Sequence, residues 1–173
     1  VHLILDARAK LVPGASGFDL IEIKRNAKLT GGVIDTQTGL FNRDVIRLHG
    51  IEQFGVDNHN TFIEKVRIIG HGGGTGIHMV CDGDDQYIAW VSLHDITIKN
   101  LDYGVKMECI NESGSAFING NGFYDLKITW CDYGIHISRN AEITTANVNA
   151  NTFHTRIQAG SNTIDGIYCD GER

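Results

Sequence analysis

Two aspartates and their neighbours form the first group of residues that could do chemistry. Asp95 directly follows His94, and Glu64 and Asp125 lie about 30 residues before and after it, an interval typical of repeat proteins. If segments at this interval stack as neighbouring strands, the two aspartates lie about 4.8 Å apart. Carboxylates that close can share a proton and act as the acid and base of glycoside cleavage. We predict Asp95, Asp125, Glu64 and His94 as a catalytic group; the alternative is that the aspartates only hydrogen-bond the backbone of turns.

A second group follows a four-residue phrase in which the second and fourth residues are apolar and the third is polar. If the phrase is a short strand, its third residue points outward in every copy. The outward column then reads Glu22, Arg47, His78, Lys106, His136 and Tyr168.

This outward column predicts a sugar-binding groove, because cations pair with acidic saccharides and aromatic planes stack on sugar rings. Its predicted substrate-binding residues are Arg47, His78, Lys106, His136 and Tyr168. The alternatives are a solvated sheet face and a subunit interface in a trimer. Trp90 and Trp130 are further candidates for stacking on sugars, against a half-buried packing role.

The elements that must position these residues follow from the repeat itself. Copies that begin with glycine occupy 76–79, 104–107, 134–137 and 166–169, and two earlier copies occupy 20–23 and 45–48. Self-similarity at a nearly even period indicates a solenoid, and alternating polarity indicates strands. We therefore predict an all-β parallel solenoid of about six coils of roughly 30 residues. The whole chain, 1–173, forms one domain: 1–19 is a lead-in strand or incomplete coil, 20–173 contains the repeat coils, and a longer parent protein is expected.

A second set of apolar residues keeps the repeat interval at every step: Ile63, Leu93, Phe123 and Phe153. These residues are predicted to stack inside the solenoid. Three positions after these residues the earlier coils have Val66, Ile96 and Leu126, but the last copy has Arg156. This break predicts a shifted strand in the last coils. Surplus residues are expected to bulge as loops at 50–60, 70–75, 81–86 and 111–122.

Composition excludes several classes of function. A net charge of −6 argues against general nucleic-acid binding, and 42% hydrophobic residues fill a core without indicating membrane insertion. The four cysteines form no C-x-x-C pair, so no zinc site is predicted. Cys81 and Cys109 occupy the same position after their repeat glycines and are expected to stack inward as reduced thiols. No cofactor or metal is predicted; the acidic loop at 82–85 is read as a solvated turn, with a hard-cation site as the alternative.

Coils of this length, with a Gly-Ile-x-Ile phrase and short polar turns, resemble right-handed parallel β-helices of the pectate-lyase-like superfamily. The resemblance extends from about Leu20 to Cys169. Within that superfamily, the Tyr-Gly-Ile turn, as at 133–135, followed by an Asn-rich loop looks most like bacteriophage tailspikes and appendages.

The resemblance implies a homotrimeric virion protein that recognises, and as a further expectation cleaves, a cell-surface polysaccharide. Polygalacturonase signatures fail, since Gly70-His71-Gly72 precedes Asp84-Asp85 instead of following it, and Arg156-Ile157 leads into Gln158. Two alternatives stay open: a structural trimerising shaft without catalysis, and a free-standing, secreted pectate-lyase-like lyase or hydrolase.

Overall fold

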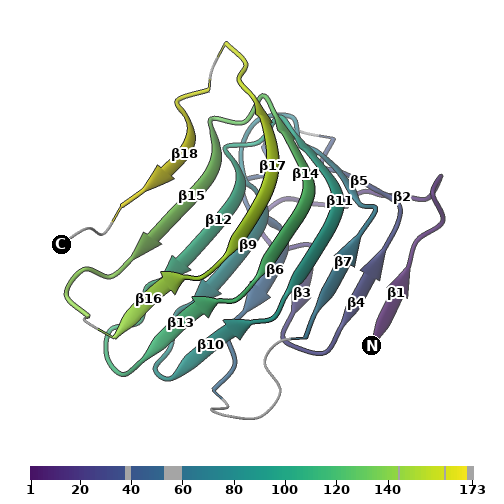
Figure 1. The fold of residues 1–173 in the computed structure, drawn as a ribbon. Coiled ribbons are helices and arrows are strands. Elements are labelled where there is room, and N and C mark those ends of the chain that lie inside the picture. The colour runs from purple at the N-terminus through teal and green to yellow at the C-terminus, as the bar shows by residue number, and fades with distance from the viewer. Residues whose placement is uncertain (38–39, 53–59, 144, 162, 171–173) are drawn as a thin grey trace.

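The computed structural model describes residues 1–37, 40–52, 60–143, 145–161 and 163–170. Its regular elements, β1 to β18, are all strands, and neighbouring strands of adjacent coils pair in parallel (Figure 1). The result is a β-solenoid of about five turns, close to the expected six. The N-terminal and C-terminal coils lie at opposite ends of the stack.

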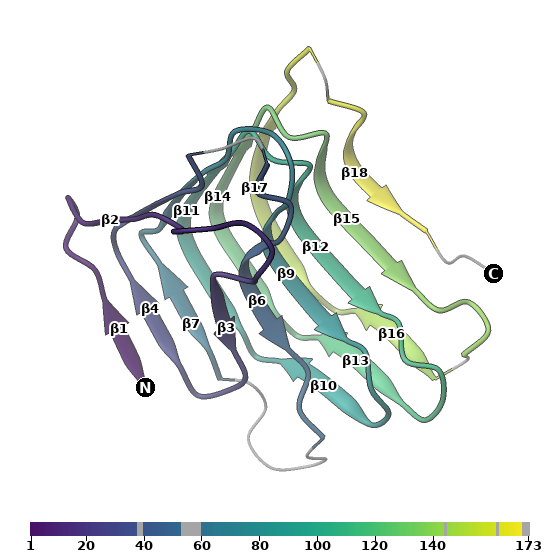
Figure 2. The same cartoon turned by 180° about the vertical axis from the view of Figure 1, so that it is seen from behind.

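Three sheets form the walls of the solenoid. Sheet A has nine strands: β1 (His2–Ile4), β2 (Lys10–Leu11), β4 (Lys28–Thr30), β5 (Val33–Asp35), β7 (Phe62–Glu64), β8 (Arg67–Ile69), β11 (Ser92–Lys99), β14 (Gly122–Thr129) and β17 (Thr152–Gln158). Sheet B has six: β3 (Ile21–Ile23), β6 (Asp44–His49), β9 (Thr75–Cys81), β12 (Tyr103–Cys109), β15 (Tyr133–Arg139) and β18 (Asp165–Cys169). Sheet C has three: β10 (Gln86–Ala89), β13 (Ala116–Asn119) and β16 (Ala146–Asn149). Figure 2 shows the stack from behind.

Strand register confirms the predicted repeat. In sheet B, Lys106 pairs with His78 on one side and with His136 on the other. In sheet A, Leu93 pairs with both Ile63 and Phe123. Residues one repeat apart therefore lie side by side on adjacent coils, as the sequence predicts.

The core fills the space between the sheets with stacked apolar side chains. Ile46, Ile77, Val105 and Ile135 are fully buried, as expected of the inward positions of the phrase. Ile167 holds the same position in the phrase but is 59% exposed, because it lies on the last described coil and no further described coil covers it. The predicted thiol stack is confirmed: Cys109 pairs in register with Cys81, and both are buried and free.

Two details of the coils differ from or refine the prediction. The segment 111–122 is not simply the expected loop, since it contains β13, which pairs with β10 and β16. The shifted strand expected near Arg156 is confirmed: Leu126 pairs with Thr155, so β17 lacks a counterpart of Asp125. Of the other predicted loops, residues 53–59 lie outside the described part of the chain.

Three corners of the coil use a left-handed backbone. One corner column contains Lys65, Asp95 and Asp125, at φ 57°, 49° and 53°. A second contains Asn60, Trp90, Gly120 and Ala150, at φ 44°, 60°, 64° and 52°. A third contains Asn100 and Trp130, at φ 59° and 58°. Outside glycine this conformation is uncommon and is adopted most readily by Asn and Asp.

The repeat glycines are required by close stacking of the backbone. A Cβ added to Gly104 would lie 2.6 Å from the carbonyl oxygen of Gly134 and 2.7 Å from Cγ2 of Ile128. Gly76 meets the carbonyl of Gly104 at the same distance, so the contact repeats from coil to coil. Gly166, in the last coil, has no atom within 4 Å of its added Cβ.

This difference predicts the outcome of two matched substitutions. Gly104→Ala is expected to lower the free energy of unfolding by about 1–3 kcal/mol, because the new methyl group overpacks against backbone that is itself fixed by pairing. Gly166→Ala is expected to cause no loss. Urea unfolding of the two variants checks the prediction, and an equal loss in both would contradict it.

Candidate functional site

The predicted outward column lies along sheet B. Register places Glu22 next to Arg47, Arg47 next to His78, and His136 next to Tyr168. The structure therefore brings all five predicted substrate-binding residues onto one face. His78 and His136 are nonetheless buried, at 7% and 8% exposure, because neighbouring side chains of that face cover them.

A hollow of about 300 Å³ opens on the N-terminal half of this face. Three residues of the predicted column line it: Arg47, His78 and Lys106. Its other lining residues come from turns and strand starts: Asp19, Asn42, Arg43, Asp44, Gly74, Thr75, Asp102 and Tyr103. The hollow thus combines cations, carboxylates and one aromatic ring.

An ion network with His78 at its centre links residues that line this hollow to Glu108, which is not among its lining residues. Nδ1 of His78 lies 2.7 Å from Oδ2 of Asp44, and Nε2 lies 2.8 Å from Oε2 of Glu108. A ring with a carboxylate at each nitrogen donates from both when it is an imidazolium. His78 is therefore held between two strands' carboxylates as a buried cation.

Cations on the neighbouring strands pair with the same two carboxylates. Arg47 donates to Asp44 at 3.1 Å and to Asp82 at 3.2 Å. Nζ of Lys106 lies 2.9 Å from Oε1 of Glu108. Asp44 and Glu108 thus each contact two cationic groups, so neither buried carboxylate is left without a charged partner.

The network shifts the pKa of its members. Burial alone would raise the pKa of Glu108, but the hydrogen bonds and charges of His78 and Lys106 outweigh it and lower the value to about 2. Burial also opposes the shift at Asp44, whose pKa is lowered because contacts with His78 and Arg47 outweigh it. Burial would lower the pKa of His78, but its two carboxylate partners raise it. The raised pKa favours the charged form of His78, which makes it a poorer general base than an ordinary histidine.

Aromatic rings occupy the C-terminal half of the same face. The ring of His136 stacks on Tyr103 at 5.3 Å and on Tyr168 at 5.2 Å between centroids. Tyr103 also stacks on Tyr133 at 5.1 Å, nearly parallel. Nζ of Lys106 lies 5.0 Å from the centroid of Tyr103, so this ring joins the two halves. We call Tyr103, Tyr133, His136 and Tyr168 the aromatic platform.

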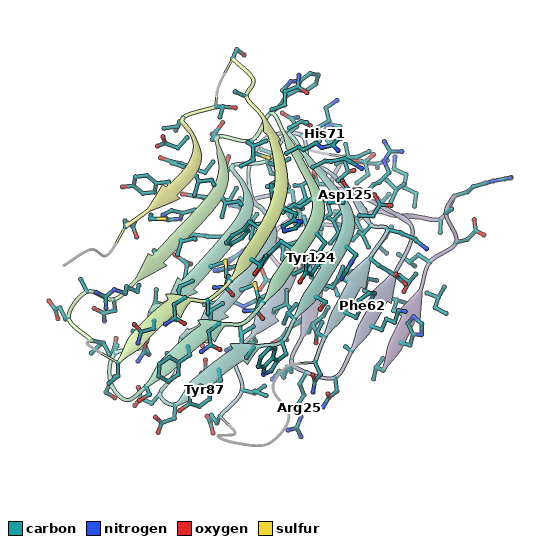
Figure 3. The ribbon with its side chains drawn as sticks, in the orientation of Figure 1. Arg25, Phe62, His71, Tyr87, Tyr124 and Asp125 are labelled. Atoms are coloured by element: carbon teal, nitrogen blue, oxygen red, sulfur yellow. The ribbon has the colours of Figure 1, made fainter. Side chains whose placement is uncertain are left out.

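The predicted catalytic group lies on sheet A. Asp95 and Asp125 occupy adjacent corners, and Nζ of Lys127 lies 3.4 Å from a carboxylate oxygen of each. Both side chains are more than half exposed. Figure 3 shows Asp125 beside Tyr124 on β14. An ammonium shared by both carboxylates weakens the mutual repulsion on which a proton-sharing pair depends.

The other two members of that group are engaged in sheet A. Glu64 contacts Nζ of Lys28 at 3.0 Å, and this hydrogen bond is the main reason why its pKa is lowered. His94 pairs in register with Glu64, and its ring lies 5.0 Å from Phe62 and 4.7 Å from Tyr124. The four predicted residues lie on three adjacent strands of sheet A, β7, β11 and β14, and therefore on a different sheet from the hollow.

Several residues of the sheet B site were missed by sequence reasoning. Glu108 follows Lys106 by two positions, so strand alternation places both on the outer face. Asp44 lies three positions before Arg47 at the start of β6. Tyr103 and Tyr133 belong to the turn repeated at 101–104 and 131–134, which carries no binding signal of its own. Following each strand two residues beyond the outward column would have found Glu108, because residues two apart in a strand lie on the same face.

The fold and this face define the class as a parallel β-solenoid with a mixed charged and aromatic wall. No protein-family model, curated protein or solved structure matches the chain. No helix long and apolar enough to cross a membrane occurs among the described residues. Within the same part of the chain, no three His, Cys, Asp or Glu side chains gather in a way that could hold a metal ion.

The His78 network predicts a specific pH dependence of stability. His78→Gln is expected to lower the free energy of unfolding by about 3 kcal/mol at pH 6, because two buried carboxylates lose their shared cation. A raised pKa in the folded state contributes stability that is complete below the ordinary histidine value of about 6.5. That contribution is lost as the pH rises through the folded-state value, so the gap to wild type should narrow toward pH 9.

Urea unfolding between pH 5 and pH 9 measures this gap. His154→Gln serves as the control, since His154 is exposed on β17 and contacts Tyr124 only through its ring. A gap for His78→Gln that stays constant over this range would contradict the imidazolium assignment.

Proposed function

We propose that this β-solenoid recognises a polysaccharide through the outer face of sheet B. The observation that carries the proposal is the continuity of the charged hollow with the aromatic platform through Tyr103 and Lys106. Sugar rings present apolar C–H faces that pack on aromatic planes, and their hydroxyl and acidic groups hydrogen-bond to charged side chains. A face that offers both kinds of group over several coils suits a chain of sugars better than a single small molecule.

The arrangement of the charges also supports binding over catalysis on this face. Asp44, His78 and Glu108 are held in fixed ionised states by one another, which suits hydrogen bonding to hydroxyl groups. Arg43 lines the hollow as well, and none of the described carboxylates forms a salt bridge with it. A cation that no described carboxylate holds is a natural partner for an acidic substituent of a saccharide.

The parent protein, in this proposal, is a bacteriophage tailspike or a related virion appendage that acts as a homotrimer. What supports this assignment is the coil length and the Gly-Ile-x-Ile phrase, together with the solenoid architecture. Under this proposal the ligand is a polysaccharide of the bacterial surface, and the solenoid supplies a rigid wall on which several sugars align.

One pair of substitutions tests which face binds. Tyr168→Ala is expected to weaken polysaccharide binding about tenfold, or ~1.4 kcal/mol, by removing an exposed ring of the aromatic platform. Tyr124→Ala removes a tyrosine of nearly equal exposure from sheet A, 37% against 39% for Tyr168. Isothermal titration of both variants with capsular polysaccharides and O-chains checks the prediction. Weakening by Tyr124→Ala alone would place binding on sheet A and contradict the proposal.

Cleavage by the sheet A group is a second candidate function, and the exposure of two carboxylates on adjacent corners favours it. Asp95→Asn and Asp125→Asn are expected to abolish polysaccharide cleavage and to change the free energy of unfolding by less than about 0.5 kcal/mol. Asn is isosteric with Asp and tolerates the left-handed backbone at both corners, so a loss of activity would report chemistry. New reducing ends and unsaturated uronate absorbance separate hydrolysis from elimination; unchanged product formation in both variants would exclude this group.

A further inference from the structure

Trp130 stands at a corner where its residue type is unexpected. It follows β14 with φ 58°, and Asn100 holds the same place one coil earlier with φ 59°. Asn adopts this left-handed conformation readily, whereas a bulky aromatic residue there is an outlier. Trp130 is also 49% exposed, so burial of its ring does not offset the strain. An outlier that the fold does not require is grounds for a functional hypothesis.

A second hollow, of about 260 Å³, opens beside this ring. Its lining residues are Asn100, Trp130, Gly160 and Ser161. A Cβ on Gly160 would lie 2.9 Å from Cδ1 of Trp130, so the absence of a side chain at 160 keeps the ring accessible. The volume lies just below the range of about 300–1,000 Å³ for drug-sized ligands, and it suits one sugar ring.

A cation lies over the same indole. Nζ of Lys99 is 4.0 Å from the centroid of Trp130. Arg47, Lys106 and Lys127 are all paired with carboxylates, but no described carboxylate forms a salt bridge with Lys99. A cation–π contact at an exposed site is weaker than a charge-assisted hydrogen bond to an anion. An anionic ligand group can therefore draw Lys99 away from the ring at little loss.

We propose that Trp130 and Lys99 form a binding site for a single sugar ring that carries a carboxylate. The C–H face of the sugar packs on the indole, and the ammonium of Lys99 pairs with the carboxylate. Asn100, whose Nδ2 donates to the Gly70 carbonyl, lines the hollow together with Ser161. The site adjoins the sheet B face, since Asn100 closely precedes Asp102 and Tyr103 in the chain, and both of these line the larger hollow. It rests on the proposed function and extends it, by naming an acidic sugar as part of the ligand.

The chain offers a direct spectroscopic test, because it contains two tryptophans. In a Trp90→Phe background, Trp130 is the sole tryptophan and its fluorescence reports the hollow. Titration uses trigalacturonate, trisialate and a hyaluronate tetrasaccharide, with maltotriose as the neutral probe. We expect a saturable change in emission with at least one acidic oligosaccharide and none with maltotriose. Adding Lys99→Met should weaken that response about tenfold.

Matched variants separate a binding role from a structural one. Trp130→Ala and Trp90→Ala each remove an exposed tryptophan from a left-handed corner, and no described cation lies over the Trp90 ring. Only Trp130→Ala should weaken calorimetric binding of the responding oligosaccharide, again about tenfold. Equal effects of the two variants would assign the loss to backbone relaxation and overturn the site.

The remaining outcomes distinguish a failure of the Trp130 site from a failure of the proposed function. An emission change that is equal with maltotriose overturns the acidic specificity. If polysaccharide binding depends on Tyr168 while Trp130 emission responds to no acidic oligosaccharide, the sheet B function stands and this site falls. If no polysaccharide binds at all, the proposed function fails, and a surviving Trp130 response would mark an independent sugar site.

Discussion

Close backbone stacking of the glycines near the start of β9, β12 and β15 is the constraint on which the rest of the structure depends. Gly76 and Gly104 each leave room for the carbonyl oxygen of the next glycine, which a Cβ would approach to 2.6 Å. With the coils fixed at this contact, strands on every wall pair in parallel and in register. Side chains one repeat apart are then neighbours on adjacent coils. Each outward column is therefore stable only if its neighbouring side chains attract one another or at least do not repel.

The outward column on sheet B is stabilised in two ways: charge pairing in its N-terminal half and ring stacking in its C-terminal half. Arg47, His78 and Lys106 are three successive cations that would repel one another if they stood alone. Asp44 and Glu108 lie between them and turn repulsion into a network with two cationic contacts per carboxylate. Beyond Lys106 the column changes to His136 and Tyr168, whose rings stack, and Nε2 of His136 also lies 3.2 Å from a carboxylate oxygen of Asp170. The same physical requirement, a stable column, thus produces a face with both kinds of group that bind sugars.

The sequence predicted those features of the fold that follow from the repeat interval alone. It placed Lys106 between His78 and His136 and anticipated the shift near Arg156, because both follow from counting residues. The strands of sheet C were not predicted, although Ile88, Ile118 and Val148 keep the repeat interval. These strands are only four residues long and contain Ala and Asn, so their sequences carry little strand signal. The His78 network was not predicted for a different reason. Asp44 and Glu108 do not belong to the outward column of the repeat, and only the structure shows that they are the carboxylates that contact the buried His78 ring.

The corners were invisible in the sequence for a further reason, and they bear most directly on function. Gly, Asn and Asp adopt a left-handed backbone most readily, which fits Asp95 and Asp125 but not Trp130. For the aspartates the conformation is mild, and Lys127 compensates both charges, so their geometry has a structural explanation that is independent of catalysis. For Trp130 the strain comes with half exposure, an open hollow and a cation that no described carboxylate holds, none of which the solenoid needs in order to fold. Trp90 shares the strain and the exposure, but no described cation lies over its ring. Among the corner residues, Trp130 is therefore where the structure departs furthest from what stability alone requires.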